Sequence, residues 1–474
     1  MANTPLSRSN VWIYGSLGFP LALLGYPLGI WLPRAYDTYI GVDTVAVGLV
    51  ITISALFDAV TDPAMGYASD RFRTRWGRRR SWILVGAPFL ALALYFLLNP
   101  EKGSTVLYLG AWFMFLRLGT TMLGVPYAAW GMELSSEYNM RTRIQASREV
   151  FVLVGLIVAA AIPAAVEFLY REETTAVLVL NAYTWLAVPL LLLVPILVVT
   201  RLPEPPPSTR EGQTGFLSSV GLMYRNKLFL RVLSIELLVG GGEAFRNALS
   251  LYFIQDYIGA SFAGTLYMVY FAMGLAAMPV WSLLARRFGK HRSLSAAIIL
   301  VGAVSIAIFT LDYGQVGAFY VLFAIKGFCF GSFAYLPRAM LADVVDLDTL
   351  RTGDARTGGY FSIFGFMTKT AQSFSGPALI ALAIVGYDTS IGASNSAVHL
   401  TWLGVLYAIV PTLCFCFALY LCWTWPLTAA KHAQLQSLLA RREGRRLAAA
   451  VAPVGPQPGS APDWSGTSPA PRSV

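Results

Sequence analysis

Two aspartates, Asp58 and Asp62, lie four residues apart inside an apolar segment that ends in a run of arginines. In a helix, this spacing puts both carboxylates on one face. An ionisable group at the centre of a bilayer costs about 3 kcal/mol on insertion scales, so the pair needs a cation, a proton or a basic partner. Carboxylate oxygens suit Na⁺, and two carboxylates can also share a proton. We therefore predict a monovalent-cation site at Asp58 and Asp62; the alternative is a structural pair neutralised by a basic residue on a neighbouring helix.

Two further side chains could belong to such a site. Thr121 lies in another apolar segment and offers a hydroxyl oxygen as a ligand, although a membrane threonine ordinarily bonds its own backbone. Lys369 lies deep in a third apolar segment, where a lysine should face the protein interior and seek a carboxylate. It could alternate with the coupling cation as partner of Asp58 and Asp62, the alternative being a lysine that reaches the membrane surface.

Six more charged residues lie within or at the start of apolar segments: Arg117, Arg148, Glu149, Glu243, Arg246 and Lys326. Arg148 could donate two hydrogen bonds to a sugar hydroxyl, a carboxylate or a phosphate, or could only anchor the membrane edge. Glu243 and Arg246 can pair within one helix, in a structural or a transport role. Arg117 and Lys326 have no obvious local partner, and two unpaired cations near a cavity would favour an anionic substrate.

The segment after the aspartates is typical of a helix end, a tight turn and a charged latch. It contains Gly66, Asp70, Arg71 and Arg78. Asp70 can pair with arginines of this loop or of a neighbouring helix end and so stabilise one conformation. The alternative is a basic anchor at the cytoplasmic surface.

The composition indicates a polytopic membrane protein. Of 474 residues, 56% are hydrophobic and 13% are charged, and the mean hydropathy is +0.60. Apolar stretches of roughly 20 residues, the length that crosses a bilayer, predict twelve spans. The spans are residues 11–33, 45–68, 81–99, 105–130, 147–168, 178–200, 229–254, 260–284, 293–311, 315–341, 358–386 and 399–425.

The net charge of +10 is concentrated in alternate loops. Basic residues follow the second, fourth, eighth and twelfth spans, whereas the opposite loops are mainly acidic. Because cytoplasmic loops are enriched in lysine and arginine, both termini should be cytoplasmic, and no nucleic-acid partner is expected. The four cysteines and three histidines show no spacing typical of a disulfide, a zinc site or a nucleophilic centre. The sequence therefore predicts a lipid-embedded protein that is not an enzyme and uses no cofactor besides a coupling cation.

The chain divides into two similar halves. We expect a six-helix bundle over residues 1–200, a cytoplasmic linker over 201–228 and a second bundle over 229–426. Gly77 and Gly289 begin similar basic motifs after the second and eighth spans, as duplicated transporter halves do. Residues 427–474 should form a cytoplasmic tail, with a basic amphipathic helix followed by a disordered end.

Several of these motifs together resemble the glycoside-pentoside-hexuronide:cation symporters of the major facilitator superfamily. They are residues 58–66, the basic run at 73–78, Thr121 with Val125-Pro126-Tyr127, Arg148 and Lys369. The resemblance implies an all-α membrane protein with the major facilitator fold, twelve helices in two six-helix bundles and alternating access. It also implies Na⁺, Li⁺ or H⁺ coupling at the positions matching Asp58 and Asp62, with Thr121 and Lys369 nearby.

The sequence departs from the sugar-binding members of this family. Those members have an aspartate in the first span and another just before the fourth-span proline, whereas here the first span contains no acid and the second position is Gly124. Galactoside specificity is therefore not expected. The same branch includes vertebrate sodium-dependent lysophospholipid transporters, which keep the aspartate pair and the lysine.

We accordingly expect a secondary active transporter in which Na⁺ or H⁺ drives symport of a sugar, a glycoside or a related solute. The alternative is cation-dependent transport of a lysophospholipid or another anionic amphiphile; a channel or a non-transporting sensor is a further alternative. The substrate candidates are Arg117, Tyr127, Arg148, Glu149, Glu243, Arg246 and Lys326. The expected state is a monomer in a bacterial inner membrane.

Overall fold

The structure is a computed structural model that describes residues 7–72, 74–135, 138–171, 175–204, 224–352, 357–390 and 394–427. The described chain is helical throughout, with short turns and a single isolated bridge, between Thr74 and Gly77. The first half contains α1 (Arg8–Ser16), α2 (Gly18–Tyr26), η1 (Pro27–Trp31), α3 (Leu32–Arg34), η2 (Ala35–Ile40), α4 (Thr44–Arg71), α5 (Arg78–Leu98), α6 (Val106–Glu133), α7 (Tyr138–Tyr170) and α8 (Ala176–Arg201). Its first five elements follow one another as a single span, Arg8–Ile40.

The second half repeats this arrangement from residue 224 onward. Its elements are α10 (Lys227–Tyr252), η4 (Phe253–Tyr257), α11 (Ala263–Phe288), α12 (Lys290–Phe309), α13 (Val316–Phe333), α14 (Leu336–Thr352), α15 (Thr357–Gln372), α16 (Ser375–Ile384), α17 (Ala397–Gly404), η5 (Val405–Ile409) and α18 (Val410–Trp423). Like the first span, the predicted spans of this half include consecutive pieces: α10 with η4, α13 with α14, α15 with α16, and α17 with η5 and α18.

Each of the twelve predicted spans coincides with a helical segment. In the described part of the chain, ten segments are long and apolar enough by themselves to cross a membrane. The other two predicted spans correspond to α10 and to the pair α15 and α16. The mean hydropathy of α10 is lowered by buried charged residues such as Glu243 and Arg246. The span formed by α15 and α16 is interrupted by a turn at Ser373 and Phe374. Both exceptions contain residues predicted to function in transport.

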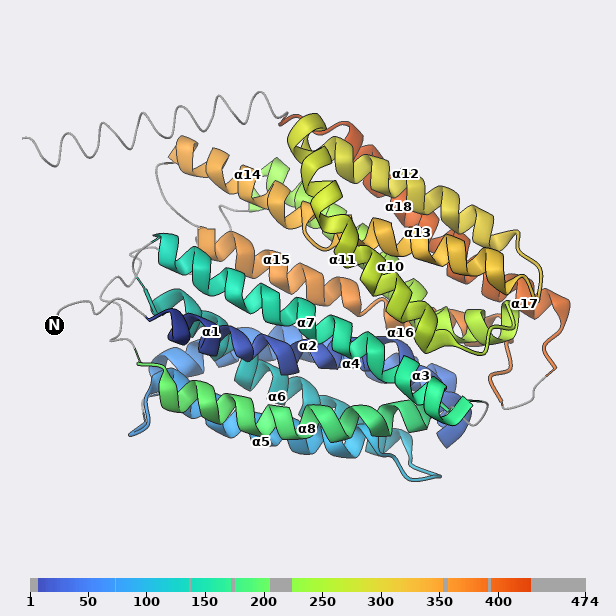
Figure 1. Cartoon of the computed structure of the whole chain (residues 1–474), viewed down its shortest axis with the longest axis horizontal. Coiled ribbons are helices and arrows are strands. Elements are labelled where there is room, and N and C mark those ends of the chain that lie inside the picture. The colour runs from blue at the N-terminus through green and yellow to red at the C-terminus, as the bar shows by residue number, and fades with distance from the viewer. Residues whose placement is uncertain are drawn as a thin grey trace, which may run out of the picture.

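The two halves lie side by side along their length. In Figure 1 the blue and green helices of the first half occupy the lower part of the view, and the yellow to red helices of the second half occupy the upper part. Contacts between the halves run chiefly through α7 with α11 and through α4 with α16. The aspartate helix α4 is therefore part of the surface where the two halves meet.

Local signals determine where several helices begin. Asp43, Thr105 and Thr175 each accept a hydrogen bond from a backbone N–H of the first turn of α4, α6 and α8, respectively. Gly77 and Gly289 precede α5 and α12 with φ of +114° and +95°, a region that favours glycine. The basic motif found twice in the sequence thus makes the same turn in both halves.

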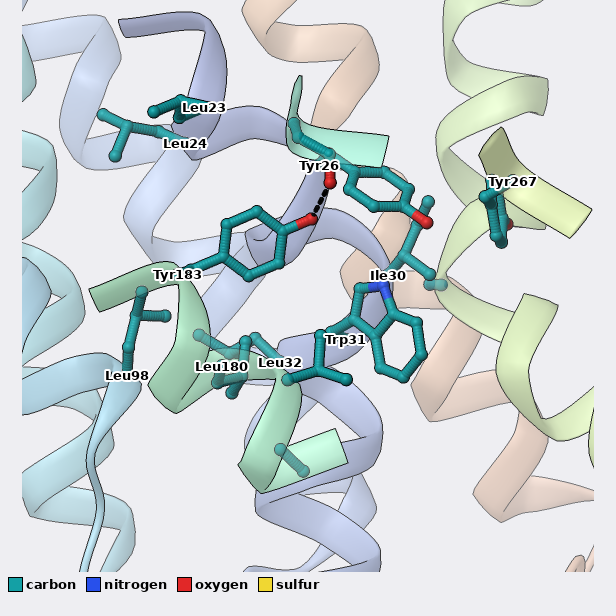
Figure 2. Packing of buried hydrophobic residues seen from close by; sticks show 14 of the residues in the cluster. Leu23, Leu24, Tyr26, Ile30, Trp31, Leu32, Leu98, Leu180, Tyr183 and Tyr267 are labelled. Carbon is teal, nitrogen blue, oxygen red and sulfur yellow. Dashed lines mark hydrogen bonds between the residues drawn. The ribbon is translucent and has the colours of Figure 1, made fainter. Parts of the chain in front are cut away.

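Aromatic residues pack where the halves meet. Figure 2 shows Tyr26 between Tyr183 of the first half and Tyr267 of α11. The ring centroid of Tyr26 lies 6.4 Å from the ring centroid of Tyr183 and 5.3 Å from that of Tyr267. Edge-on contacts at such distances stabilise packed rings beyond their buried area. The hydrophobic core therefore continues across the contact between α2 and α11.

Two predicted segments lie mostly outside the described residues. Of the linker, residues 205–223 are outside, and of the tail, residues 428–474 are outside. Their predicted organisation stays a prediction.

Candidate functional site: a four-charge cluster between the halves

The structure brings Asp58, Asp62, Thr121 and Lys369 together. The Thr121 hydroxyl donates to Asp62 Oδ1 at 2.8 Å. The Lys369 ammonium lies 2.5 Å from Asp62 Oδ2 and 3.8 Å from Asp58 Oδ2. Lys369 belongs to α15 of the second half, whereas both aspartates belong to α4 of the first. The cluster therefore joins the two halves through one ammonium.

Helix geometry explains how the first half builds its side of the cluster. Asp58 and Asp62 are four residues apart on α4, and Arg117 and Thr121 are four residues apart on α6. Residues at this spacing share a helix face. Arg117 Nη1 lies 3.2 Å from Asp58 Oδ2. The two helix faces therefore lie against each other, with Arg117 beside Asp58 and Thr121 beside Asp62.

The position of Arg117 corrects one prediction. Arg117 is not an unpaired cation near the cavity, because it is the partner of Asp58. The prediction failed because a pairing between two helices leaves no trace in the sequence around Arg117. The arginine also lies over the ring of Phe113, 5.3 Å from its centroid.

The charges of the cluster balance one another. Two carboxylates face one guanidinium and one ammonium, so the site is neutral as it stands. The exposed fractions of the side chains are 4% for Asp58, 21% for Asp62 and 35% for Lys369. Asp58 Oδ1 is buried and accepts no hydrogen bond from the described residues. This free oxygen, the Asp62 carboxylate and the Thr121 hydroxyl form a set of hard oxygen ligands that fits a monovalent cation.

A second charged cluster lies inside the second half. Arg246 Nη1 lies 3.3 Å from Glu243 Oε1, and Arg246 also donates to the Ser305 hydroxyl at 3.1 Å. Lys326 is 1% exposed. Its ammonium lies 3.4 Å from the Tyr407 hydroxyl and 5.1 to 5.5 Å from the centroids of three aromatic rings. Within the described residues Lys326 has no ion pair, and Glu243 Oε2 and Arg246 Nε are buried without a hydrogen-bond partner.

The remaining substrate candidates lie on α6 and α7. Tyr127 is 1% exposed, and its hydroxyl donates to Tyr14 O at 2.8 Å. Arg148 lies over the Tyr127 ring at 5.8 Å from its centroid, and its Nε has no partner in the described chain. Glu149 is exposed. Their role in substrate binding stays a prediction.

The basic loop after α4 is held by acids that the sequence did not single out. Glu133, at the end of α6, pairs with Arg78 at 2.8 Å and with Arg79 at 2.7 Å. Glu204 accepts from the backbone N–H groups of Arg78 and Arg79 at the start of α5. A glutamate at a helix end is too common a feature to predict such a pairing.

For the other predicted latch residues, the structure shows no hydrogen bond or ion pair with another helix among the described side chains. Arg71 is exposed and donates to the Tyr67 hydroxyl at 2.7 Å, one turn earlier on its own helix. Gly66 lies within α4, and the side chain of Asp70 lies outside the described part of the structure. The latch that the structure does show lies within the first half.

At the opposite end, a polar network connects the two halves. Arg34 donates two hydrogen bonds to the Asp256 carboxylate, at 2.7 and 3.1 Å, and Tyr387 donates to it at 2.6 Å. Asp37 accepts from Tyr252 at 2.7 Å and from Thr389 at 2.8 Å. Arg34 and Asp37 lie in α3 and η2, Tyr252 and Asp256 lie in α10 and η4, and Tyr387 and Thr389 lie in the loop after α16.

A buried carboxylate extends this connection. Glu167 of α7 is 2% exposed and accepts from the backbone N–H groups of Gly264 and Thr265 in the first turn of α11. It therefore caps a helix of the other half. The sequence indicates Asp37 and Glu167 only as acids of the loops opposite the basic ones, because their partners in the other half are more than 90 residues away.

The two ends of the molecule thus differ. The end formed by η2, η4 and the start of α11 is closed by bonds between the halves. At the end formed by the basic loops, every ion pair between described side chains lies within one half. Among the described residues, the end formed by η2, η4 and the start of α11 thus holds hydrogen bonds between the halves that the other end does not show.

Comparison with known proteins identifies the family. Residues 13–429 match the family model described as "MFS/sugar transport protein". The putative glycoside/cation symporter YagG of Escherichia coli is 24% identical, covering 86% of this chain and 92% of that protein. The sodium-dependent lysophosphatidylcholine symporter 1-A of Danio rerio is also 24% identical, covering 90% and 88%.

Solved structures show the same fold. The nucleoside transporter NupG superposes with a TM-score of 0.61 at 13% identity, covering 88% of this chain and 99% of that one. A D-xylose-proton symporter superposes with a TM-score of 0.58 at 14% identity, covering 88% and 96%. The chain is a multi-pass membrane protein with twelve helices in two bundles, and it is a transporter rather than an enzyme. It belongs to the glycoside-pentoside-hexuronide:cation symporter family of the major facilitator superfamily.

Proposed function

We propose that this protein is a cation-coupled symporter that moves a sugar, a glycoside or a related small solute by alternating access. The observation that supports this most is the contact of Lys369 with both Asp58 and Asp62 across the two halves. A Na⁺ ion or a proton that binds the aspartates would compete with the ammonium for the same oxygens. Cation binding would then loosen or rearrange a contact between the halves, which is the link that symport needs.

The protein would lie in a bacterial inner membrane with the basic loops and both termini in the cytoplasm. The enrichment of arginine and lysine in those loops supports this orientation. The end closed by Arg34, Asp37, Asp256 and Glu167 would then face outward, and the conformation described would be inward-facing. A monomer remains our expectation for its oligomeric state.

The experiment uses purified protein in proteoliposomes with an imposed Na⁺ or pH gradient. Asp58→Asn and Asp62→Asn should abolish cation-stimulated uptake, because each removes a charged ligand. Asp312→Asn is the matched control, since Asp312 lies in an exposed loop and contacts only Gln315 in the described chain. Uptake by either site variant that rises with the cation as in the wild type would contradict the proposal.

Lysophospholipid transport is a second candidate. An apolar groove of about 340 Å³ between α4 and α6, lined by residues such as Val50, Ile53 and Met114, has the chemistry of an acyl-chain site. The absence of acids at the two sugar-binding positions is consistent with a non-sugar substrate. A thermal-shift screen with glycosides, hexuronides and lysophosphatidylcholine, each with and without Na⁺, separates the candidates, because a bound ligand stabilises the folded state.

A further inference from the structure

Glu236 lies in α10 where this helix packs against α15. Its side chain is buried, with 9% of the residue exposed. The Thr368 hydroxyl of α15 donates to Glu236 Oε1 at 2.8 Å. One turn further along α10, a Cβ at Gly240 would lie 3.1 Å from the Cβ of Ala371 and 3.8 Å from Glu236 Oε1. The two helices therefore touch closely beside the carboxylate.

Glu236 differs from the other buried carboxylates of the described chain. Asp58, Glu243 and Asp343 each have a cationic partner within 4 Å. Asp37 and Glu167 each accept three hydrogen bonds. Within the described residues, Glu236 has one hydroxyl donor and no ion pair. An isolated carboxylate charge at this depth is costly, so a mobile charge must be able to neutralise it.

The charged groups around Glu236 do not supply that neutralisation by contact. Arg338 of α14 is exposed and acts on Glu236 only through space. Lys369 of α15 is bound to Asp62. On α10 itself, Arg231 bonds Leu421 O and Thr424, and Glu243 pairs with Arg246. The other elements packed against α10 are α3, η1, η4, α14, α16, η5 and α18. Of these, η1 and α16 have no titratable residue, and α18 has three cysteines and Tyr420. The titratable residues of the others, besides Arg338, are Arg34, Asp256, Tyr257, Asp343, Asp346, Asp348, Arg351 and Tyr407.

Helix α15 connects Glu236 with the cation cluster. Thr368 contacts Glu236 in the second half, and the next residue, Lys369, contacts Asp62 in the first half. The helix ends four residues after Thr368, at Gln372, and a turn separates it from α16. A change in charge at either carboxylate therefore acts on the same short helix.

We propose that Glu236 is a proton-binding site and that α15 couples its protonation to cation binding at Asp58 and Asp62. A neutral Glu236 needs no counter-charge, whereas an ionised Glu236 attracts basic groups and holds the Thr368 hydroxyl more strongly. By linkage, a proton that changes the position of α15 changes cation affinity, and the cation changes proton affinity by the same factor. The coupling rests on the proposed function, whereas the proton site does not.

The test measures Tm of the purified full-length protein across mildly acid to mildly alkaline pH, with and without Na⁺. Glu236→Gln has the shape of the protonated acid and cannot titrate. Glu101→Gln is the matched control, because Glu101 is exposed in the loop before α6. The difference in Tm between the wild type and Glu236→Gln should change with pH, and that for the control should not. A constant difference for Glu236→Gln would overturn the proton site.

Thr368→Val tests the coupling separately, because it removes the hydroxyl and keeps the carboxylate. In the wild type, the apparent Na⁺ affinity from the Tm shift should vary with pH, and Glu236→Gln and Thr368→Val should each alter that variation by about fivefold. If the apparent Na⁺ affinity of both variants depends on pH as it does in the wild type, the coupling would be overturned. A wild type that Na⁺ fails to stabilise at every pH would refute Na⁺ binding at Asp58 and Asp62, and with it the coupling of that binding to Glu236. Infrared difference spectra of the wild type, in which Glu236→Gln deletes a protonated-carboxyl band, give a second readout of the proton site.

Discussion

One of the contacts that close the end formed by η2 and η4 is a partly buried ion pair, so Asp256→Asn should weaken that closure. Arg34 makes two hydrogen bonds to Asp256, and the side chains are only 10% and 30% exposed. Hydrogen bonds to charged groups contribute about 1.5 to 3 kcal/mol each. Asparagine keeps one acceptor oxygen, and solvent screens the exposed part of the pair, so we expect the low end, about 1.5 kcal/mol. That loss would shift the ratio of molecules closed at this end to molecules open at this end about tenfold toward the open form, which is the outward-facing form in the proposed orientation.

The assay measures the distance between spin labels at the closed end. Leu107→Cys in the first half and Tyr313→Cys in the second half are suitable sites, because these residues are 83% and 75% exposed. The four native cysteines are first replaced by alanine or serine. Asp256→Asn in nanodiscs should broaden the distance distribution toward longer values, and Asp312→Asn, the same change in an exposed loop, should leave it as in the wild type.

Two results would refute this reasoning. An unchanged distribution for Asp256→Asn would mean that the ion pair does not hold the halves together. An equal lengthening for Asp312→Asn would mean that loss of any acidic charge at this end is sufficient. Glu167→Gln gives an independent check, since it weakens the cap on α11 without touching Arg34.

Three further predictions follow from close contacts and buried charges. Lys369→Met removes the ammonium that competes for Asp62, so Na⁺ should bind about tenfold more tightly while coupled uptake falls; equal Na⁺ affinity by calorimetry would contradict this. Gly376→Val places a side chain against the backbone of α4 and should favour the outward-open form in the same spin-label assay, whereas Gly317→Val, which meets open space, should not. Arg246→Met leaves a buried glutamate without its cation and should cost about 3 kcal/mol of unfolding free energy; an unchanged midpoint in chemical denaturation would show that the pair is dispensable.

The aspartates, Thr121 and Lys369 as a partner of the aspartates could be predicted from the sequence, but the pairing of Arg117 with Asp58 could not. Asp58, Asp62 and Lys369 are conspicuous because charge is costly inside an apolar span, and that cost is visible in one dimension. The contact of Arg117 with Asp58 depends on how α6 lies against α4, which no local pattern encodes.

The twelve spans and the duplication are properties of the sequence itself, because bilayer thickness sets the length of an apolar helix and related halves keep related motifs. The closed end is a property of the tertiary structure alone. Arg34 and Asp256 are separated by 222 residues, and Asp37 and Thr389 by 352. Such pairs form only once the two halves dock. The sequence by itself determined which residues are too costly to be accidental, and the packing of the two halves decided which of them meet, because electrostatic partners are selected by distance in space.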